Sequence, residues 1–276
     1  RVLFVWEGDR ADGYGARERI VRSALDIAEA GMGVVLAIPA GAALDADAES
    51  ISMQLGGAEA IRVLRISSGR SARAPDERIQ AMAAEGDAIL GDIAATFVHV
   101  VGTWRTALPA LQAARGRGLP LVYQRLHFPE YAGEGRVADW RLSEMFQLEQ
   151  SLERLVCEHA DLVLVASGKQ AEEVRRRTAK GAVEVEQLAL PAPVHALEPA
   201  RDAARRQLDL PDGERVIGFL HEGHSFGGLE DLVEALVPAS TDAPWPGTLL
   251  VVARGKLSSA HRRLLERLPD ERVRVV

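Results

Sequence analysis

The sequence predicts an α/β protein with two Rossmann-like doubly wound parallel-sheet domains. Short apolar runs alternate with helical patterns along the chain, and one segment near each end opens with a strand, a glycine-containing loop and an amphipathic helix. These two segments lie near 2–30 and 216–237. A strand that leads through a glycine loop into a helix directs unpaired backbone N–H groups at one point, which suits a phosphate group. Two such units predict a ligand held between two nucleotide-fold domains.

The expected strands are short apolar runs without polar alternation, which is typical of parallel strands covered on both faces. In chain order they lie at 2–6, 34–38, 61–66, 97–101, 119–125, 162–166, 183–188, 215–220, 248–253 and 272–276. Repeated strand–helix units of this kind build a doubly wound sheet, whose ligands bind beyond the carboxyl ends of the strands.

Two of the expected helices show a clear apolar face. The helix over 17–30 carries it on Ile20, Ala24, Ile27 and Ala28. A long helix over 137–159 carries it on Leu148, Leu152, Leu155 and Val156. Because an amphipathic helix turns its apolar face to the core, we expect these side chains to be buried.

Prolines interrupt the strand–helix alternation at 191–193 and again at 211. We therefore divide the chain into a first domain at 1–195 and a second domain at 196–276. Val2 already lies inside an expected strand, and the last residues resemble the opening of another. The sequence thus predicts a chain cut at both ends, with an incomplete second domain and no activity as it stands.

Composition narrows the class of protein. With 276 residues, 47% hydrophobic residues and a formal charge of -7, the chain is that of a globular protein and not of a general nucleic-acid binder. The single cysteine, Cys157, excludes an intramolecular disulfide and a cysteine-based zinc cluster. No apolar run reaches transmembrane length, and no secretory signal opens the chain. The prediction is a cytoplasmic protein, with peripheral membrane contact left open.

The first glycine loop contains Gly13, Tyr14 and Gly15. It does not complete a dinucleotide fingerprint, because Glu18 stands where the third glycine would permit close helix–strand packing. NAD or FAD binding is therefore disfavoured. The loop either lets the backbone approach another ligand or is a plain strand-to-helix turn.

The second glycine loop runs from 221 to 228 and begins with His221, Glu222 and Gly223. It indicates a binding site for phosphate or ribose at a helix N-terminus, beside Gly218 of the preceding strand. Metal binding by the loop histidines is a weak reading, because no third ligand is evident. We expect no metal and no cofactor.

A basic turn, Arg254-Gly255-Lys256, follows the next strand. Two cations around a glycine at a carboxyl strand end suit a diphosphate. The alternative is a solvated basic turn.

Two further candidates follow the strand at 119–125. His127 is the candidate catalytic residue, and Glu130 is a weaker candidate for contact with an acceptor, because both come after a carboxyl strand end. His99 lies within an apolar strand and reads as a core histidine. Arg175-Arg176-Arg177 reads as a solvated helix face.

The order of these segments resembles the family 4 glycosyltransferases of the GT-B fold. In the first domain, the segment at 13–17 is similar to the family's first glycine loop, the segment at 159–167 to its A-D-x-V-x-x-x-S strand, and the segment at 190–194 to its I-P-N-G-V hinge. In the second domain, the segment at 217–235 is similar to the family's V-G-R-L…K-G-L segment, and the segment at 251–255 to its V-V-G-x-G strand. The resemblance covers nearly the whole chain.

Some positions depart from the family pattern. Phe219 and Gly227 stand where the family often places an Arg and a Lys on the donor diphosphate, and Ala192-Pro193 replaces Asn-Gly in the hinge. The family's E-x₇-E donor segment would follow Val276. Diphosphate binding would then rest on Arg254, Lys256 and backbone amides.

The resemblance implies a retaining glycosyltransferase of polysaccharide biosynthesis that moves a sugar from a nucleotide-sugar donor to a glycan, lipid-linked or small-molecule acceptor. The second domain would bind the donor through the residues at 218–223 and 254–256. The first would bind the acceptor near Gly13, Tyr14, Gly15 and Glu130. A nucleotide-sugar 2-epimerase of similar shape, with His221, Glu222 and Glu130 as acid–base groups, and a non-catalytic binding protein remain alternatives.

Overall fold

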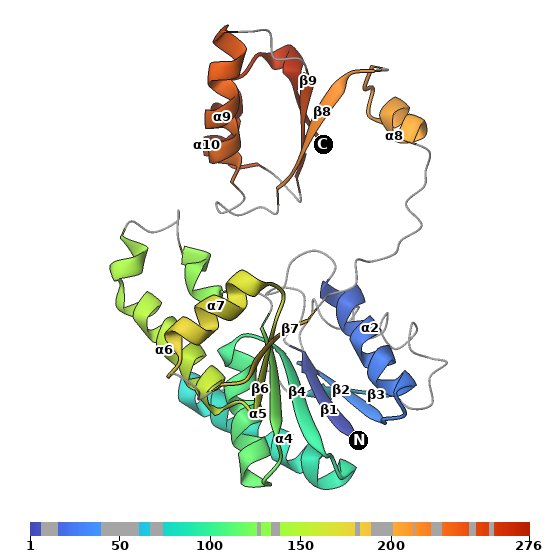
Figure 1. The fold of residues 1–276 in the computed structure, drawn as a ribbon, viewed down its shortest axis with the longest axis vertical. Coiled ribbons are helices and arrows are strands. Elements are labelled where there is room, and N and C mark those ends of the chain that lie inside the picture. Colours follow the sequence, from blue (N-terminus) through green and yellow to red (C-terminus); the bar gives the residue numbers. More distant parts are fainter. Residues whose placement is uncertain are drawn as a thin grey trace. The chain divides into compact units, whose positions relative to one another are not determined.

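A computed structural model (Figure 1) shows an α/β protein in two compact units. It describes residues 1–6, 16–39, 61–66, 74–125, 128–133, 139–179, 183–188, 201–211, 213–221, 228–242, 247–253 and 257–276. The first unit comprises Arg1–Tyr131 and Leu142–Pro193, and the second comprises Ala132–Arg141 and Val194–Val276. The predicted domain boundary at 195/196 lies outside the described residues.

The first unit is built on one parallel sheet of seven strands in the order β3-β2-β1-β4-β5-β6-β7. The strands are β1 (Val2–Trp6), β2 (Val34–Pro39), β3 (Ile61–Ile66), β4 (Phe97–Gly102), β5 (Leu121–Arg125), β6 (Leu162–Val165) and β7 (Val185–Gln187). The strand order reverses between β1 and β4, which is the position where doubly wound sheets bind ligands.

Helices cover both faces of this sheet. They are α2 (Ala16–Glu29), α4 (Pro75–Ile93), α5 (Trp104–Gly116), α6 (Glu144–His159) and α7 (Gly168–Arg177), with short 3₁₀ turns η1 (Pro129–Gly133) and η2 (Trp140–Leu142). Along β1, Phe4 packs with α2 on one face, while Leu3 and Val5 belong to the larger core formed with α4, α5, α6 and α7 on the other. The alternation follows from the two-residue period of a strand.

The second unit contains a parallel sheet of three strands in the order β10-β9-β8. Its strands are β8 (Arg215–His221), β9 (Gly247–Ala253) and β10 (Val273–Val275), and its helices are α8 (Arg201–Gln207), α9 (Leu229–Asp242), α10 (Ser259–Leu265) and the turn η3 (Asp270–Arg272). The core contains Leu229 and Val233 of α9, Leu249 and Val251 of β9, and Leu265 of α10.

Each predicted strand is present in the structure, with small shifts at the ends. The predicted long helix over 137–159 was wrong in its first part, because η2 ends at Leu142 and α6 begins only after Ser143. The Ser143 hydroxyl accepts a hydrogen bond from the Phe146 amide, which caps α6 at that residue.

The predicted burial of Leu148 and Leu155 on this helix was also wrong, whereas Leu152 packs against the core. Leu148 and Leu155 are 50% and 38% exposed, whereas Glu149 and Glu153 are turned into the core beside Val156. The two carboxylates accept hydrogen bonds from Trp104 and Tyr123 inside the unit. This orientation of α6 leaves Leu148 and Leu155 on its outer side.

Candidate functional site

In the first unit, the carboxyl edge of the sheet at its switch point is formed by β1 and β4. Trp6 pairs with Val101, and Gly102 pairs with Arg125 of β5. The predicted acceptor residues Gly13, Tyr14 and Gly15 follow β1, and the predicted catalytic residue His127 follows β5. All four lie outside the described residues, and their roles stay predictions.

Arg125, at the carboxyl end of β5, begins a buried ionic network. Arg125 and Glu130 are 3% and 0% exposed, and Arg125 Nη2 lies 3.1 Å from Glu130 Oε2. Arg177 of α7 binds the other carboxylate oxygen of Glu130 and donates a hydrogen bond of 2.8 Å to the Tyr131 hydroxyl. The network thus joins the segment after β5 to the last turn of α7.

The ring of Phe128 contacts both arginines of this network. The Arg125 guanidinium is 4.1 Å from the centre of its ring, and the Arg177 guanidinium is 4.8 Å away. Both are cation–π distances. Phe128 and Glu130 are therefore held against the sheet, next to the position of His127 in the sequence.

A second acidic residue, Glu153 of α6, continues the network inward. It is 1% exposed and accepts hydrogen bonds of 2.8 Å from the Trp104 amide and from the Tyr123 hydroxyl. Arg125 Nε lies 3.7 Å away. Burial raises the pKa of Glu153 above its usual value, against the opposing effect of Arg125.

Glu149, one turn earlier on α6, binds the start of α5. It accepts a hydrogen bond of 2.6 Å from the Trp104 indole and pairs with Arg105. Trp104 is the first residue of α5 and is buried there. The space lined by Arg125, Glu153 and Arg177 has no room for a water-sized molecule. The network is therefore structural and does not form a ligand-binding site.

The reading of Arg175–Arg177 as a solvated helix face was wrong for Arg177, which is 7% exposed on its side chain. The residue beside it, Arg176, is 70% exposed and pairs with Glu173. The sequence held a weak signal for the difference: Arg177 follows the buried residue Val174 by three positions and shares its face of α7.

Glu130, the predicted acceptor contact, lies inside the first unit with its carboxylate held by two guanidinium groups. An acceptor contact by this residue stays a prediction. The prediction for His99 is confirmed: the ring is 7% exposed, and His99 Nε2 lies 3.0 Å from Gln124 Oε1. Burial lowers the pKa of His99 to about 4.

In the second unit, the carboxyl ends of β8 and β9 lie side by side, because His221 pairs with Ala253. His221 is 3% exposed, and its ring meets the His261 ring of α10 edge to face at 4.5 Å. His261 Nε2 lies 3.3 Å from Glu230 Oε1 in the first turn of α9. The predicted donor residue His221 thus contacts His261, and His261 in turn contacts the carboxylate of Glu230.

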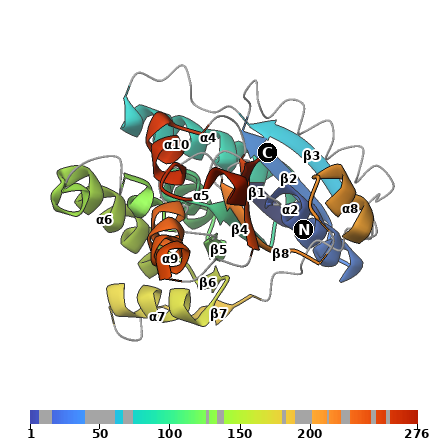
Figure 2. The ribbon, with the colours of Figure 1, turned by 90° about the horizontal axis from the view of Figure 1, so that it is seen from above.

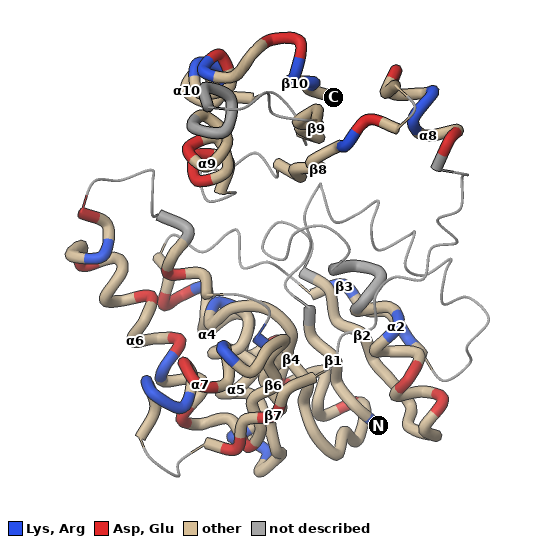
Figure 3. Tube along the Cα trace, turned by 45° about the horizontal axis from the view of Figure 1, so that its top comes forward, with Lys and Arg blue, Asp and Glu red and all other residues tan. Residues whose placement is uncertain are grey.

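Helix α9 begins directly after this strand end. Gly228, just before it, has a positive φ of 73°, which favours glycine at this turn. The first turn of α9 carries Glu230 and Asp231. Acidic positions occur along α9 in Figure 3. These carboxylates oppose an anion at the helix N-terminus, so a bound diphosphate would need positive side chains as well.

Gly218 lies within β8, and a Cβ added there would meet open space among the described residues. The other predicted donor residues, Glu222, Gly223, Arg254, Gly255 and Lys256, lie outside the described residues, and their roles stay predictions.

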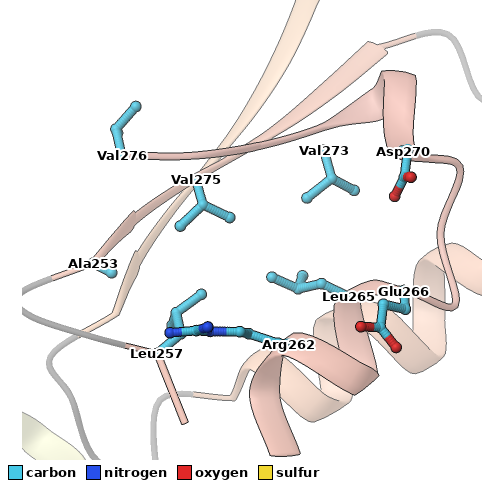
Figure 4. A pocket seen from close by; sticks show the side chains of 9 residues that line it. All are labelled: Ala253, Leu257, Arg262, Leu265, Glu266, Asp270, Val273, Val275 and Val276. Carbon is cyan, nitrogen blue, oxygen red and sulfur yellow. The ribbon is translucent and has the colours of Figure 1, made fainter. Parts of the chain in front are cut away.

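A cavity of 490 Å³ lies beside the end of this sheet (Figure 4). Valines of β10 form one wall, and the opposite wall contains Leu257 and the α10 residues Arg262 and Leu265. Glu266 and Asp270 border it on the polar side. The cavity begins at Ala253 and so adjoins the position of the predicted diphosphate turn in the sequence.

The described residues contain neither a metal-binding cluster nor a membrane-spanning helix. Among them, no group of three or more His, Cys, Asp or Glu side chains is arranged to hold a metal ion. In the same part of the chain, no helix is both long enough and apolar enough to cross a membrane.

Comparison with solved structures identifies the fold. The chain is similar over its whole length to a UDP-GlcNAc 2-epimerase from Neisseria meningitidis bound to UDP-GlcNAc, with 12% identity, 71% of that chain covered and a TM-score of 0.63. It is similar to Phytolacca americana UGT2 complexed with UDP-2-fluoro-glucose and pterostilbene, with 14% identity, 71% of that chain covered and a TM-score of 0.58.

A third similar structure is Acinetobacter baumannii MurG, with 14% identity, all of this chain and 68% of that chain covered and a TM-score of 0.51. No protein-family profile matches the sequence. No curated protein matches it either. At these identities the likeness concerns the fold: the chain has the Rossmann-like fold of GT-B UDP-sugar enzymes.

Proposed function

We propose that this protein is a retaining glycosyltransferase that uses a nucleotide-sugar donor bound at the carboxyl edge of the second sheet. The observation that supports it most is the position of His221 at the end of β8, directly before a glycine-rich loop and the N-terminus of α9. In a parallel sheet this edge collects the groups that bind phosphate and ribose. Similar structures include proteins solved with UDP-GlcNAc and with a UDP-sugar analogue.

The chemistry follows from the charge that develops on the leaving group. As the sugar leaves, negative charge grows on the diphosphate, and preorganised cations and amide dipoles stabilise it. Because Glu230 and Asp231 oppose an anion at α9, the main stabilisation would come from Arg254 and Lys256. In a retaining transfer, a diphosphate oxygen accepts the proton of the acceptor on the face that the sugar leaves.

Calorimetry with UDP, UDP-glucose and UDP-GlcNAc tests the donor site. We expect binding by the wild-type chain, weakened by about 1.5–3 kcal/mol for each charged hydrogen bond lost in Arg254→Ala/Lys256→Ala. The matched control is Arg206→Ala/Arg263→Ala, which removes the same charge from exposed positions of α8 and α10 that do not line the cavity beside the second sheet. Absence of binding to all common nucleotides, or equal weakening by both double variants, contradicts the proposal.

The role proposed for His127 has its own test. In the full-length protein, we expect His127→Ala to lower sugar transfer while the melting temperature stays nearly unchanged. If the variant instead unfolds while activity per folded molecule is preserved, the histidine is structural.

A second function, nucleotide-sugar 2-epimerisation, is favoured by one observation, the contact of His221 with His261 and of His261 with Glu230. Inversion at a carbon requires its C–H bond to break and to form again, which is work for positioned acid–base groups. Incubation with UDP-GlcNAc in deuterium oxide separates the two functions. Deuterium at the sugar C2 supports epimerisation, and unlabelled sugar on an acceptor supports transfer.

A further inference from the structure

Helix α5 begins at the position where doubly wound sheets bind anions. It follows β4 directly, and β4 pairs with β1 at the point where the strand order reverses. At such a point the N-terminus of the following helix directs backbone N–H groups and the positive end of its dipole toward a ligand. A phosphate group interacts favourably with both. What occupies this helix end therefore decides whether the first unit can hold a phosphate there.

A side chain of the protein itself occupies this helix end. Glu153 of α6 accepts a hydrogen bond of 2.8 Å from the amide of Trp104, the first residue of α5. The carbonyl oxygen of Thr103 accepts hydrogen bonds of 3.1 and 3.0 Å from the amides of Thr106 and Ala107. The Glu153 carboxylate thus stands where an oxygen of a bound phosphate would stand, at the first amide of the helix.

The other contacts of Glu153 complete an arrangement that suits an anion. Its second carboxylate oxygen accepts a hydrogen bond of 2.8 Å from the Tyr123 hydroxyl, and Arg125 Nε lies 3.7 Å from the same oxygen. An amide at a helix N-terminus, a hydroxyl and a guanidinium are donors that proteins use to bind phosphate. Here α5 and β5 supply these donors, and α6 supplies the anion.

The packing leaves no room for a second anion. Glu153 is 1% exposed, and the space that it lines with Arg125 does not admit a water-sized molecule. Helices α5 and α6 lie side by side (Figures 1 and 2). One turn before Glu153, Glu149 accepts a hydrogen bond from the Trp104 indole. A phosphate at this helix end would meet two buried carboxylates, and like charges at short range in a poorly solvated site repel each other.

The arginines near this edge are engaged as well. Arg125 and Arg177 both bind the carboxylate of Glu130, which is 0% exposed. Two guanidinium groups therefore face two buried carboxylates, those of Glu130 and Glu153, and the charges balance within the protein. An added phosphate would bring negative charge that no group of this network compensates.

We propose that Glu153 takes the place of a bound phosphate and thereby determines the class of ligand that the first unit accepts. By filling the anion position at the switch point, it excludes phosphate from the N-terminus of α5. A ligand at this edge of the first sheet is then uncharged where it meets α5, as the hydroxyl group of a sugar or an alcohol is. The diphosphate of a donor binds the second unit alone. That last assignment rests on the proposed function, whereas the exclusion of phosphate from α5 does not.

Titration of the wild-type chain with inorganic phosphate tests the exclusion directly. Amide chemical shifts are followed while potassium chloride keeps the ionic strength constant. We expect the amides of Trp104, Arg105 and Thr106 to keep their shifts at millimolar phosphate. Saturable shifts of these amides overturn the proposal, and this measurement does not require any variant to fold.

Removal of the carboxylate tests whether its position is an anion site. We expect Glu153→Ala to lower the melting temperature of the first unit by about 10 °C. Acetate should then bind in place of the side chain and raise the melting temperature by about 4 °C at about ten times its dissociation constant, compared with equal chloride.

The matched control for the acetate experiment is Glu158→Ala. It removes the same charge from α6, at a side chain that is 27% exposed and pairs with Arg154. Acetate should have no specific effect on this variant. Equal responses of the two variants to acetate, or no response of Glu153→Ala, overturn the proposal.

Titration with UDP-GlcNAc separates this inference from the proposed function. Saturable shifts at the ends of β8 and β9 without shifts at the N-terminus of α5 support both. Saturable shifts at the N-terminus of α5 contradict this inference. Absence of any shift contradicts the proposed function and the assignment of the diphosphate, while the phosphate and acetate titrations decide the role of Glu153.

Discussion

Arg177 of α7 and Glu130 of η1 form an ion pair inside the first unit, although 47 positions separate them in the chain. Arg125 binds the same carboxylate from the end of β5. The three side chains are almost completely buried. They hold η1 against the last turn of α7. The predicted catalytic residue His127 precedes η1 in the sequence and lies outside the described residues.

We expect Arg177→Ala to destabilise the protein by about 3–5 kcal/mol. It leaves Arg125 as the one buried arginine beside the carboxylates of Glu130 and Glu153, so one buried negative charge loses its compensation. The matched control is Arg176→Ala on the same helix, whose side chain is 70% exposed. That change should have a much smaller effect. Urea unfolding measures both, and equal destabilisation by the two variants would show that the Glu130 pair contributes nothing of its own.

A second prediction concerns the pH dependence of stability through His99. Its pKa is about 4 in the folded protein and 6.5 in a free side chain, so the unfolded chain takes up a proton first as the pH falls. The stability that comes from keeping His99 neutral is complete above pH 6.5 and is lost as the pH falls toward 4. The total is roughly 3 kcal/mol, from 1.36 kcal/mol for each pKa unit.

The comparison that isolates this effect uses His99→Gln, which keeps a polar side chain beside Gln124 but does not titrate. Its free energy of unfolding should fall less steeply between pH 6.5 and pH 4 than that of the wild-type chain. If His99→Gln has the wild-type slope, folding does not lower the pKa of His99.

The third prediction concerns two glycines of the second sheet. A Cβ at Gly247 would lie 2.5 Å from the Arg215 carbonyl oxygen, whereas a Cβ at Gly218 would meet open space among the described residues. We expect Gly247→Ala to destabilise the second unit by about 1–3 kcal/mol, because the backbone has to move. Gly218→Ala should leave the thermal unfolding of that unit nearly unchanged. Similar effects of the two substitutions would contradict the close approach of β8 and β9.

The strands were predictable because each is a short apolar run bounded by polar or glycine-rich sequence, as at 97–101 and 162–166. The orientation of α6 was not. Leu148 and Leu155 have the periodicity of a core face, but Glu149 and Glu153 take that face because Trp104 and Tyr123 supply donors there. Those donors are distant in the sequence, so no local pattern reveals them.

The candidate site was predictable in part for a similar reason. The position of His221 at a carboxyl strand end follows from the apolar run before it, and the structure confirms that position. Its contact with His261 and the pairing of His261 with Glu230 depend on how α9 and α10 pack over the sheet. The three residues come from separate elements, and no spacing in the sequence connects them.

The central claim, that the carboxyl edge of the second sheet binds a nucleotide sugar, is tested most directly by amide chemical-shift mapping during a titration with UDP-GlcNAc. We predict saturable shifts at His221, Gly228 and Leu229, with the amides of α6 in the first unit unchanged. Shifts confined to the first unit, or no saturable shift at the ends of β8 and β9, would contradict the claim.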